Sequence, residues 1–374
     1  MTENLPARSL TQESSYRESA PASRPCVSVV VLAYNIAPYL EACLNSLRRQ
    51  SFEDFEVLLV NDGSTDETGE IARRASLLDP RLRVVDNARN RGTFVSRCIG
   101  AERSRGNYLC LIDGDDWVAP SFLQEMVVAA RQFNADVVEC SAYGIHPDGR
   151  ACMVSRAETS PRTATQRDIL RRALDRDIWP IAWNKMFERR LYLQAAPMLR
   201  VIDEHLIVAD DKLFMLPILG FARRFVHLDR ALYRYRLRAD SSTRLRNEAS
   251  DLRHITHSSR VDAHLQDIFA LLGVAEEHAA RIARNRADEI MLALRIMDRY
   301  PEVDPTRRQL ERQLRAGYGS SAVDALQQRR QRALGVLGWL LRRYSFPTLA
   351  RMTWRSAKRM AEIRLHRSSR HTSI

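Results

Sequence analysis

Short apolar runs alternate with helix-like periods between residues 26 and 145. The first run spans Val27 to Ala33, and after it Leu40, Cys43, Leu44 and Leu47 share one helical face. Strands that alternate with helices predict an α/β fold with a doubly wound, mainly parallel sheet and helices on both faces. The further apolar runs cover 55–60, 82–85, 108–112 and 137–140, and helical periods begin near Asp66, Phe94 and Phe122.

The same pattern divides the chain into regions. Residues 1–24 are rich in Ser, Glu, Pro and Arg and lack an apolar period, which predicts a disordered leader. Long helical periods return after about residue 250, where Pro301 ends one of them. We expect an α/β domain at 25–245 with halves at 25–145 and 146–245, a helical C-terminal region at 246–328, and a basic amphipathic tail at 329–374.

Polar residues gather at the positions where the predicted strands end. In a doubly wound sheet, ligands bind in the crevice beyond the carboxyl ends of the strands, so these residues are the first candidates for a site. The four clusters are Tyr34-Asn35, Asn61-Asp62-Gly63-Ser64, Asn90-Arg91-Gly92 and Asp113-Gly114-Asp115-Asp116.

Asp113 and Asp115 directly follow an apolar strand at positions i and i+2, so one turn can aim both carboxylates at one point. Hard oxygen ligands of this kind suit Mg²⁺ or Mn²⁺. Substrate phosphates and water then complete the coordination of the ion. An isolated Asp-x-Asp is more often a solvated turn that caps the next helix. The position at a strand end, in register with Asp62, favours a site instead.

These four motifs, in this order, resemble the family 2 inverting glycosyltransferases of the GT-A fold, and more narrowly the bacterial surface-polysaccharide members. The resemblance is strong over 26–145, weaker over 180–240, and we claim none beyond 250. It implies a nucleotide-sugar-binding half at 25–145 and an acceptor half at 146–245. The matching residues are Val27 to Asn35, Val60 to Asp66, Asn90-x-Gly92, and Ile112 to Trp117 with Val118-x-Pro120.

The resemblance implies roles for the three acids. Asp62 would accept a hydrogen bond from the nucleobase, Asp113 would contact the ribose or the metal, and Asp115 would bind the metal on the diphosphate. These roles are chemically sensible, because a carboxylate can accept from the imide N–H of uracil. A divalent cation also neutralises the charge that develops on a departing diphosphate.

Three further residues at the strand ends have two open interpretations each. Tyr34 can stack on the base and Asn35 can bond to it, but either could equally cap the next helix. Arg91 can reach the pyrophosphate or can simply face solvent. Asp66 is interpreted as a helix cap.

The acceptor half carries the candidate base. An inverting transfer needs a carboxylate that takes the proton of the acceptor hydroxyl. In the resembling family this is the Asp of a Glu-Asp pair, so the resemblance points to Asp211, with Asp210 in place of the usual Glu. A helix cap is the structural alternative for the pair. Trp183 can offer a ring face to a sugar or be a buried indole, and Lys185 can contact a phosphate or acceptor or be an exposed lysine.

The charge is concentrated at one end of the sequence. The formal net charge is +12, and twelve Lys and Arg residues lie beyond position 328 against Glu362 alone. The remainder is nearly neutral, which argues against a nucleic-acid partner. Short apolar segments with Trp and flanking Arg in the tail fit a helix lying on an anionic membrane surface, or a helix packed on the catalytic domain.

Together these features predict an inverting, metal-dependent transferase. It would move a single hexosyl or N-acetylhexosaminyl group from a nucleotide-sugar, most simply a UDP-sugar, to a hydroxyl of a lipid-linked or polysaccharide acceptor. The absence of a signal-peptide pattern and of a long apolar segment predicts a cytoplasmic protein, with peripheral attachment to the inner face of the membrane as an option. The alternative is a degenerate, non-catalytic sugar- or membrane-binding protein of the same fold.

Overall fold

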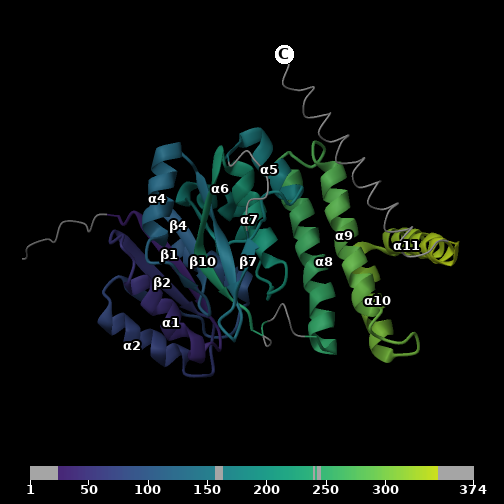
Figure 1. The fold of residues 1–374 in the computed structure, drawn as a ribbon, viewed down its shortest axis with the longest axis horizontal. Helices are drawn as coiled ribbons and strands as arrows, with labels where there is room; N and C mark the ends of the chain where they lie inside the picture. Colours follow the sequence, from purple (N-terminus) through teal and green to yellow (C-terminus); the bar gives the residue numbers. More distant parts are fainter. Residues whose placement is uncertain (1–23, 156–162, 239–240, 242–245, 344–374) are drawn as a thin grey trace, which may run out of the picture.

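The computed structural model describes residues 24–155, 163–238, 241 and 246–343. Residues 1–23 of the predicted leader and residues 344–374 of the predicted tail therefore lie outside the described residues. A mixed sheet runs through the centre of the α/β domain (Figure 1), with the strand order β3-β2-β1-β4-β9-β6-β10-β5. Its parallel part consists of β1 (Val27–Ala33), β2 (Phe55–Asn61), β3 (Leu82–Asp86) and β4 (Tyr108–Asp113).

The other strands extend this parallel core on one side. β9 lies antiparallel between β4 and β6, whereas β6 and the long β10 run parallel to each other. Short strands add to this side, since β7 pairs with β6 and both β5 and β8 pair with β10. Their bounds are β5 (Trp117–Val118), β6 (Val137–Ile145), β7 (Ala151–Ser155), β8 (Thr163–Thr165), β9 (Lys185–Glu188) and β10 (Arg224–Arg236).

Helices cover both faces of the sheet, as the alternating pattern predicts. β1 and β2 are buried along their whole length, as expected for strands covered on both sides. One face carries α1 (Ala37–Arg48), α2 (Thr68–Leu78) and α4 (Phe122–Phe133). The opposite face carries α3 (Thr93–Arg103), α5 (Gln166–Leu174), α6 (Arg189–Leu199) and α7 (Asp210–Phe221).

Four helices follow the sheet and lie beside it in Figure 1: α8 (Glu248–Leu271), α9 (Ala279–Met297), α10 (Pro305–Tyr318) and α11 (Ser320–Arg343). α8 joins the two parts of the molecule. Its C-terminal half buries Val261, Leu265, Ile268 and Phe269 in the same core as α5 and α7. Ile255, nearer its N-terminus, belongs to a separate core formed with the following helices.

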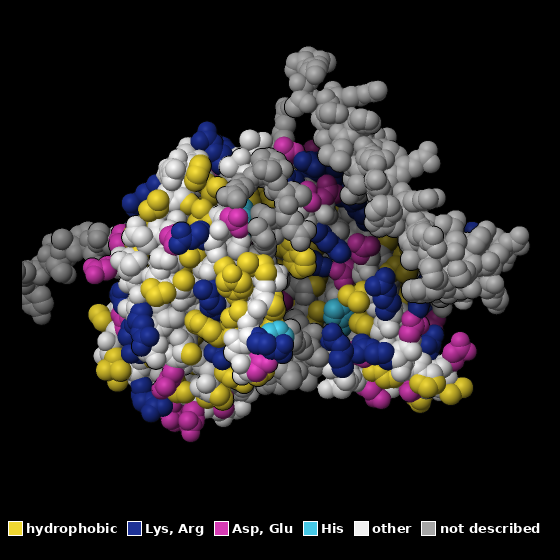
Figure 2. Space-filling view, viewed as in Figure 1, with side chains coloured by type: hydrophobic (Ala, Val, Ile, Leu, Met, Phe, Trp, Pro, Cys, Tyr) yellow, Lys and Arg dark blue, Asp and Glu magenta, His cyan; other side chains and the backbone are white. Residues whose placement is uncertain are grey.

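The surface chemistry agrees with the sequence interpretation. Basic and acidic side chains are interspersed over the face shown in Figure 2, with no single large patch of one sign among the side chains coloured there. Among the described helices, none combines the length and apolar character needed to cross a bilayer. The six cysteines are free thiols, five of them buried and Cys152 partly buried.

Candidate active site

The predicted strand-end residues meet at the carboxyl edge of the parallel sheet. In the registers of this sheet, Ala33 pairs with Asn61, and Leu32 pairs with Asp113, so the three strands end at nearly the same level. The loops after β1 and β2 are tied together there. The backbone N–H of Asn35 donates to Ser64 Oγ at 3.1 Å, and Asn35 Oδ1 accepts from the N–H of Thr65 at 2.9 Å.

The side chain of Asn35 does not cap the helix that follows it. Side chains near the start of α2 accept hydrogen bonds at the start of α1 instead. The N–H of Ala37 donates to Asp66 Oδ2, and the N–H of Ile36 donates to Thr68 Oγ1. Asp66 also accepts from the N–H of Thr68, so its carboxylate binds the first N–H group of both α1 and α2, although the N-cap position of α2 is Glu67. Tyr34 is 43% exposed beside this loop, which leaves its ring accessible for stacking.

Asp62 anchors the loop that follows β3. Its Oδ1 accepts from the Arg91 N–H at 2.9 Å and from Asn87 Nδ2 at 2.8 Å, while Oδ2 accepts from the Gly92 N–H at 2.9 Å. A carboxylate offers about four acceptor positions, so one remains for a ligand. The Arg91 guanidinium pairs with Asp203, which holds it across the loop.

The acidic turn after β4 contains one acid with a structural role. Asp116 is buried, and its carboxyl accepts from Tyr233 Oη at 2.8 Å and from the N–H of Arg236 at 2.7 Å. These bonds fasten the turn to β10. Asp115 lies nearer to solvent, with Oδ2 at 3.4 Å from an Arg238 nitrogen, and its carbonyl accepts from Arg236 Nε at 2.8 Å.

A single buried arginine joins the two acidic motifs. Arg97, on α3, places its guanidinium 3.7 Å from Asp113 Oδ1 and 3.2 Å from Asp211 Oδ1, and it also pairs with Asp210. The acidic turn after β4 and the candidate base therefore belong to one cluster, although about 100 residues separate them in the chain. Burial works against the charge of Arg97, but the three carboxylates raise its pKa above its usual value.

The two acids at the start of α7 differ in accessibility. The Asp210 side chain is 8% exposed and accepts from Thr93 Oγ1 at 2.7 Å in addition to its pairing with Arg97. Asp211 is 27% exposed, and its Oδ1 accepts from the Ala182 N–H at 3.1 Å. Burial raises the pKa of Asp211, with Arg97 opposing and Asp210 adding to the rise. Asp210 thus holds Arg97, while its predicted role in acceptor or sugar binding stays a prediction.

The environment of Lys185 matches neither of the two interpretations drawn from the sequence. It is fully buried, and its Nζ lies 2.6 Å from Glu139 Oε1 and 3.0 Å from Asn184 Oδ1. Lys185 and Glu139 are direct cross-strand partners, and His227 is the partner of Glu139 on the other side. The lysine is therefore the cation of an internal ion pair, and the interpretation as an exposed lysine is wrong.

Trp183 lies at the edge of the same region and is partly exposed. Its ring stacks on Tyr235 with centroids 5.5 Å apart and packs at 4.7 Å against Tyr233. Since Tyr233 also binds Asp116, this aromatic group connects the acidic turn to the predicted acceptor half.

The carboxylates of Asp113 and Asp115 fit a shared hard cation, but only with help from a substrate. Their ion-pair contacts with Arg97 and Arg238 are 3.7 and 3.4 Å, longer than hydrogen bonds. In the part of the chain that is described, no group of three or more His, Cys, Asp or Glu residues is arranged to hold a metal. Mg²⁺ and similar ions commonly bind one or two carboxylates and take the other oxygens from substrate phosphates and water.

Sequence reasoning missed Arg97, although the chain contains a signal for it. Phe94, Arg97, Cys98 and Ala101 lie at i, i+3, i+4 and i+7, the spacing of one buried helical face. A charged residue at an apolar position of such a face must have buried partners, and its partners here are the three acids.

Comparisons with known proteins agree with this geometry. The Glycosyl transferase family 2 model matches residues 28–194. A Bacillus subtilis (strain 168) protein described as the uncharacterized glycosyltransferase EpsJ is 32% identical over 259 residues, which cover 68% of this chain and 73% of the relative. The succinoglycan biosynthesis protein ExoO of Rhizobium meliloti (strain 1021) is 30% identical over 264 residues, covering 70% of this chain and 73% of the relative.

A solved structure supports the same fold. The crystal structure of S. aureus TarS 1–349 in complex with UDP-GlcNAc matches with a TM-score of 0.50 at 20% identity, covering 81% of this chain and 91% of that one. The parallel sheet with acids at its carboxyl edge is that of a GT-A glycosyltransferase. The chain belongs to glycosyltransferase family 2 and is a nucleotide-sugar-dependent transferase.

Proposed function

We propose that this enzyme transfers one sugar, with inversion, from a UDP-sugar to a hydroxyl of a lipid-linked or polysaccharide acceptor in cell-surface polysaccharide synthesis. The observation that carries the proposal is the convergence of Asp113, Asp210 and Asp211 on Arg97. It brings a donor-side acid and an acceptor-side acid together, as a single displacement requires. A relative named for succinoglycan biosynthesis supports the polysaccharide setting.

In this proposal Asp211 is the general base. The acceptor oxygen forms its bond to the anomeric carbon as the bond from that carbon to the diphosphate oxygen breaks, and the hydroxyl proton passes to Asp211. A base works best when its pKa lies closer to the working pH, and burial moves Asp211 in that direction. Its hydrogen bond from the Ala182 N–H and its contact with Arg97 fix the orientation of the carboxylate.

The donor would bind along the carboxyl edge of β1, β2 and β4. Tyr34 supplies a ring for the base, Asn35 lies next to it, and the remaining acceptor position of Asp62 takes a hydrogen bond from the base. Asp113 and Asp115 would hold Mn²⁺ or Mg²⁺, which when bound neutralises charge on the leaving diphosphate. Arg91 lies beside this edge and pairs with Asp203. A bound diphosphate would compete with Asp203 for the Arg91 guanidinium.

Two isosteric variants test the assignment. We expect Asp115→Asn to abolish the extra thermal stabilisation that Mn²⁺ gives in a screen of nucleotide-sugars, since bound ligands raise apparent stability. Asp211→Asn should keep this donor response and lose about 100-fold or more in transfer rate, the usual contribution of a general base. Asp54→Asn, at an exposed position on the opposite edge of β2, is the control. Full donor hydrolysis and transfer by both site variants would refute the proposal.

We also propose that the basic tail beyond position 328 attaches the enzyme to the inner leaflet. The support is compositional, because its Arg-rich sequence carries interfacial Trp residues; residues 344–374 lie outside the described part of the chain. The full chain should sediment with vesicles that contain anionic lipid, and a chain that stops after 328 should not. Equal binding of the two chains would remove the tail from the proposal.

A further inference from the structure

A largely apolar cavity of about 560 Å³ lies between the α/β domain and the helical region. Its walls come from α5 and α7 on one side and from α8 and α9 on the other, helices that lie next to one another in Figure 1. Leu265 and Phe269 line it from α8, and Leu292 lines it from α9. Trp179, which is 60% exposed, forms part of its rim.

The cavity reaches the candidate base. Asp211 is one of its lining residues, and the Ala182 N–H that binds Asp211 belongs to the same short segment as Trp179 and Ile181. On its other side Asp211 contacts Arg97, which in turn contacts Asp113 of the metal motif. Asp211 therefore stands between the donor edge and the cavity, the position that a base needs relative to donor and acceptor.

Most of the charged side chains that line the cavity are in ion pairs. Lys212 pairs with Glu289, and Arg176 lies 3.2 Å from Asp288, in both cases between the α/β domain and α9. Asp262 lies 3.6 Å from Arg286 Nε and also accepts from Gln266 at 2.7 Å. Since these charges are already paired, recognition in the cavity falls mainly to its apolar lining, which favours an uncharged, apolar group over an anion.

One polar atom beside the cavity has no hydrogen-bond partner within the described part of the free protein. Ser258 is buried and lines the cavity, and its Oγ has no hydrogen-bond partner among the described residues. A buried hydroxyl without a partner is uncommon, because leaving it unsatisfied costs about 1–3 kcal/mol. A hydroxyl or ether oxygen of a bound molecule could satisfy it.

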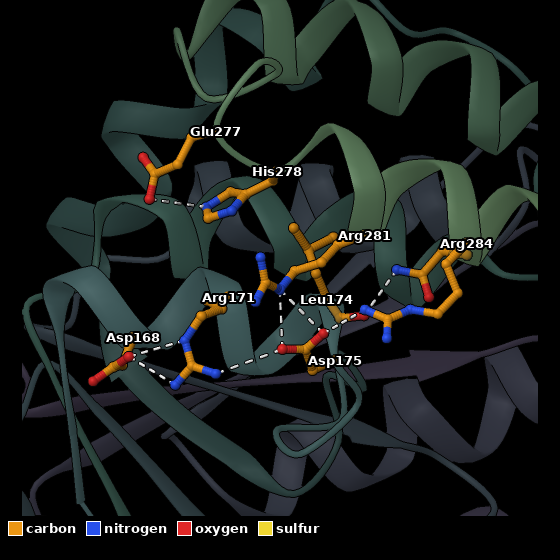
Figure 3. A network of polar contacts seen from close by, with 9 residues as sticks. Asp168, Arg171, Leu174, Asp175, Glu277, His278, Arg281 and Arg284 are labelled. Carbon is orange, nitrogen blue, oxygen red and sulfur yellow. Dashed lines mark hydrogen bonds and ion pairs between the residues drawn. The ribbon is translucent and has the colours of Figure 1, made fainter. Parts of the chain in front are cut away.

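Ion pairs fix the two walls relative to each other. Asp175, at the end of α5, lies within 3.5 Å of nitrogen atoms of Arg171, Arg281 and Arg284, and Figure 3 shows the two arginines of α9 reaching across to it. Asn285 Nδ2 donates to the carbonyl of Leu174 at 2.9 Å beside this group. These contacts join α5 to α9, two of the helices that line the cavity.

We propose that this cavity is the acceptor subsite and that it selects amphiphilic acceptors of the glycolipid class. The alkyl or isoprenoid part would lie between α7, α8 and α9, an oxygen near it would bond to Ser258 Oγ, and the sugar would extend toward Asp211. This inference rests on the proposed function, whose donor edge it does not alter.

Titration calorimetry with the full chain tests this inference. It compares the binding of octyl β-D-glucopyranoside, kept below its critical micelle concentration, with that of methyl β-D-glucopyranoside. The octyl compound should bind at least about tenfold more tightly, since each buried methylene contributes roughly fourfold in affinity. Trp179→Ala and Leu292→Ser should each weaken octyl binding by about fivefold or more. Leu271→Ser is the matched control, because Leu271 is on α8 and 73% exposed but does not line the cavity.

Ser258→Ala separates ligand binding from a role in folding. Its Oγ makes no bond in the free protein, so the variant should unfold at an unchanged or higher temperature, while octyl glucoside binds about 2- to 10-fold more weakly. Equal affinity for both glucosides, no measurable octyl binding, or equal weakening by Leu271→Ser would overturn the inference. Nucleotide-sugar stabilisation measured on the same variants reports the donor site separately, so its absence would refute the proposed function and leave the cavity result standing.

Discussion

Arg97 shows how a single buried cation can organise a site made of acids. Asp113, Asp210 and Asp211 would repel one another at close range, and each would be costly to bury alone. The guanidinium offers five donors in a planar fork, so it can serve several carboxylates at once. Its near-complete burial means that the ion pairs are shielded from water and salt, unlike pairs on the surface.

Replacing Arg97 should therefore affect stability far more than replacing a surface arginine. We expect Arg97→Met to lower the free energy of unfolding by about 3–5 kcal/mol, because it leaves buried carboxylates unpaired. Arg200→Met, which breaks the exposed pair with Glu102, should cost less than about 1 kcal/mol. Urea denaturation measures both. Adding Asp210→Asn to Arg97→Met should recover part of the loss, whereas strictly additive effects would show that the two residues are not coupled.

At this scale the sequence was a partial guide. The strand-end acids could be found because the alternating pattern places each of them at the carboxyl end of a predicted strand. Their convergence at one edge of the sheet is confirmed. Their individual ligand roles stay predictions. The exposed alternative for Lys185 was wrong, because strand pairing between distant segments brings its ion-pair partner Glu139 beside it. A lysine next to a tryptophan contains no local sign of such a pairing.

At the scale of elements, the loop at Asn90 to Gly92 is fixed from three directions. Asp62 accepts from the backbone of Arg91 and Gly92, Asn90 Oδ1 also accepts from Gly92, and the carbonyl of Leu206 receives the N–H of Phe94 at the start of α3. Gly92 has a φ of +85°, and a Cβ there would lie 2.9 Å from the Leu206 carbonyl oxygen. Glycine is therefore needed both for conformation and for space.

Two glycine substitutions separate these requirements. Gly149→Ala, where φ is +84° and nothing lies within 4 Å of the new Cβ, should destabilise by about 1–2 kcal/mol from backbone strain alone. Gly92→Ala should cost about 2–4 kcal/mol, because a backbone clash adds to the same strain. It should also weaken nucleotide-sugar binding, which Gly149→Ala should leave unchanged. Thermal denaturation with and without donor measures both effects, and equal destabilisation would contradict the packing argument.

Element positions followed closely from periodicity in the first half of the chain. The predicted strand Val27 to Ala33 is observed with those bounds, and each predicted helix up to α4 is present. The second half was harder to predict because β9 enters the sheet antiparallel between β4 and β6, and β10 returns to pair with β6 from about 90 residues away. Such order is decided by packing between distant segments, which local hydrophobic spacing does not encode.

For the whole molecule, α8 makes the helical region part of the catalytic core. Its residues Val261, Leu265, Ile268 and Phe269 lie in one apolar cluster with the helices that carry Arg97 and Asp211. The proposed boundary near residue 245 separates two stretches of sequence, but the core continues across it. We therefore expect the site and the C-terminal half of α8 to unfold together.

A matched pair of substitutions on α8 tests this cooperativity. Phe269→Ala should lower the free energy of unfolding by about 3–5 kcal/mol, since Phe269 is 2% exposed and its removal leaves a cavity. Leu271→Ala, two positions away but exposed, should change it by less than about 0.5 kcal/mol. Scanning calorimetry should show a single transition for these parts, moved downward by Phe269→Ala, and nucleotide-sugar binding should disappear at the same temperature. The contrary result would be two transitions, with Phe269→Ala shifting only the earlier one and donor binding persisting above it. In that case α8 would be an independent unit, and the proposed acceptor cavity would lack the rigid wall that it needs next to Asp211.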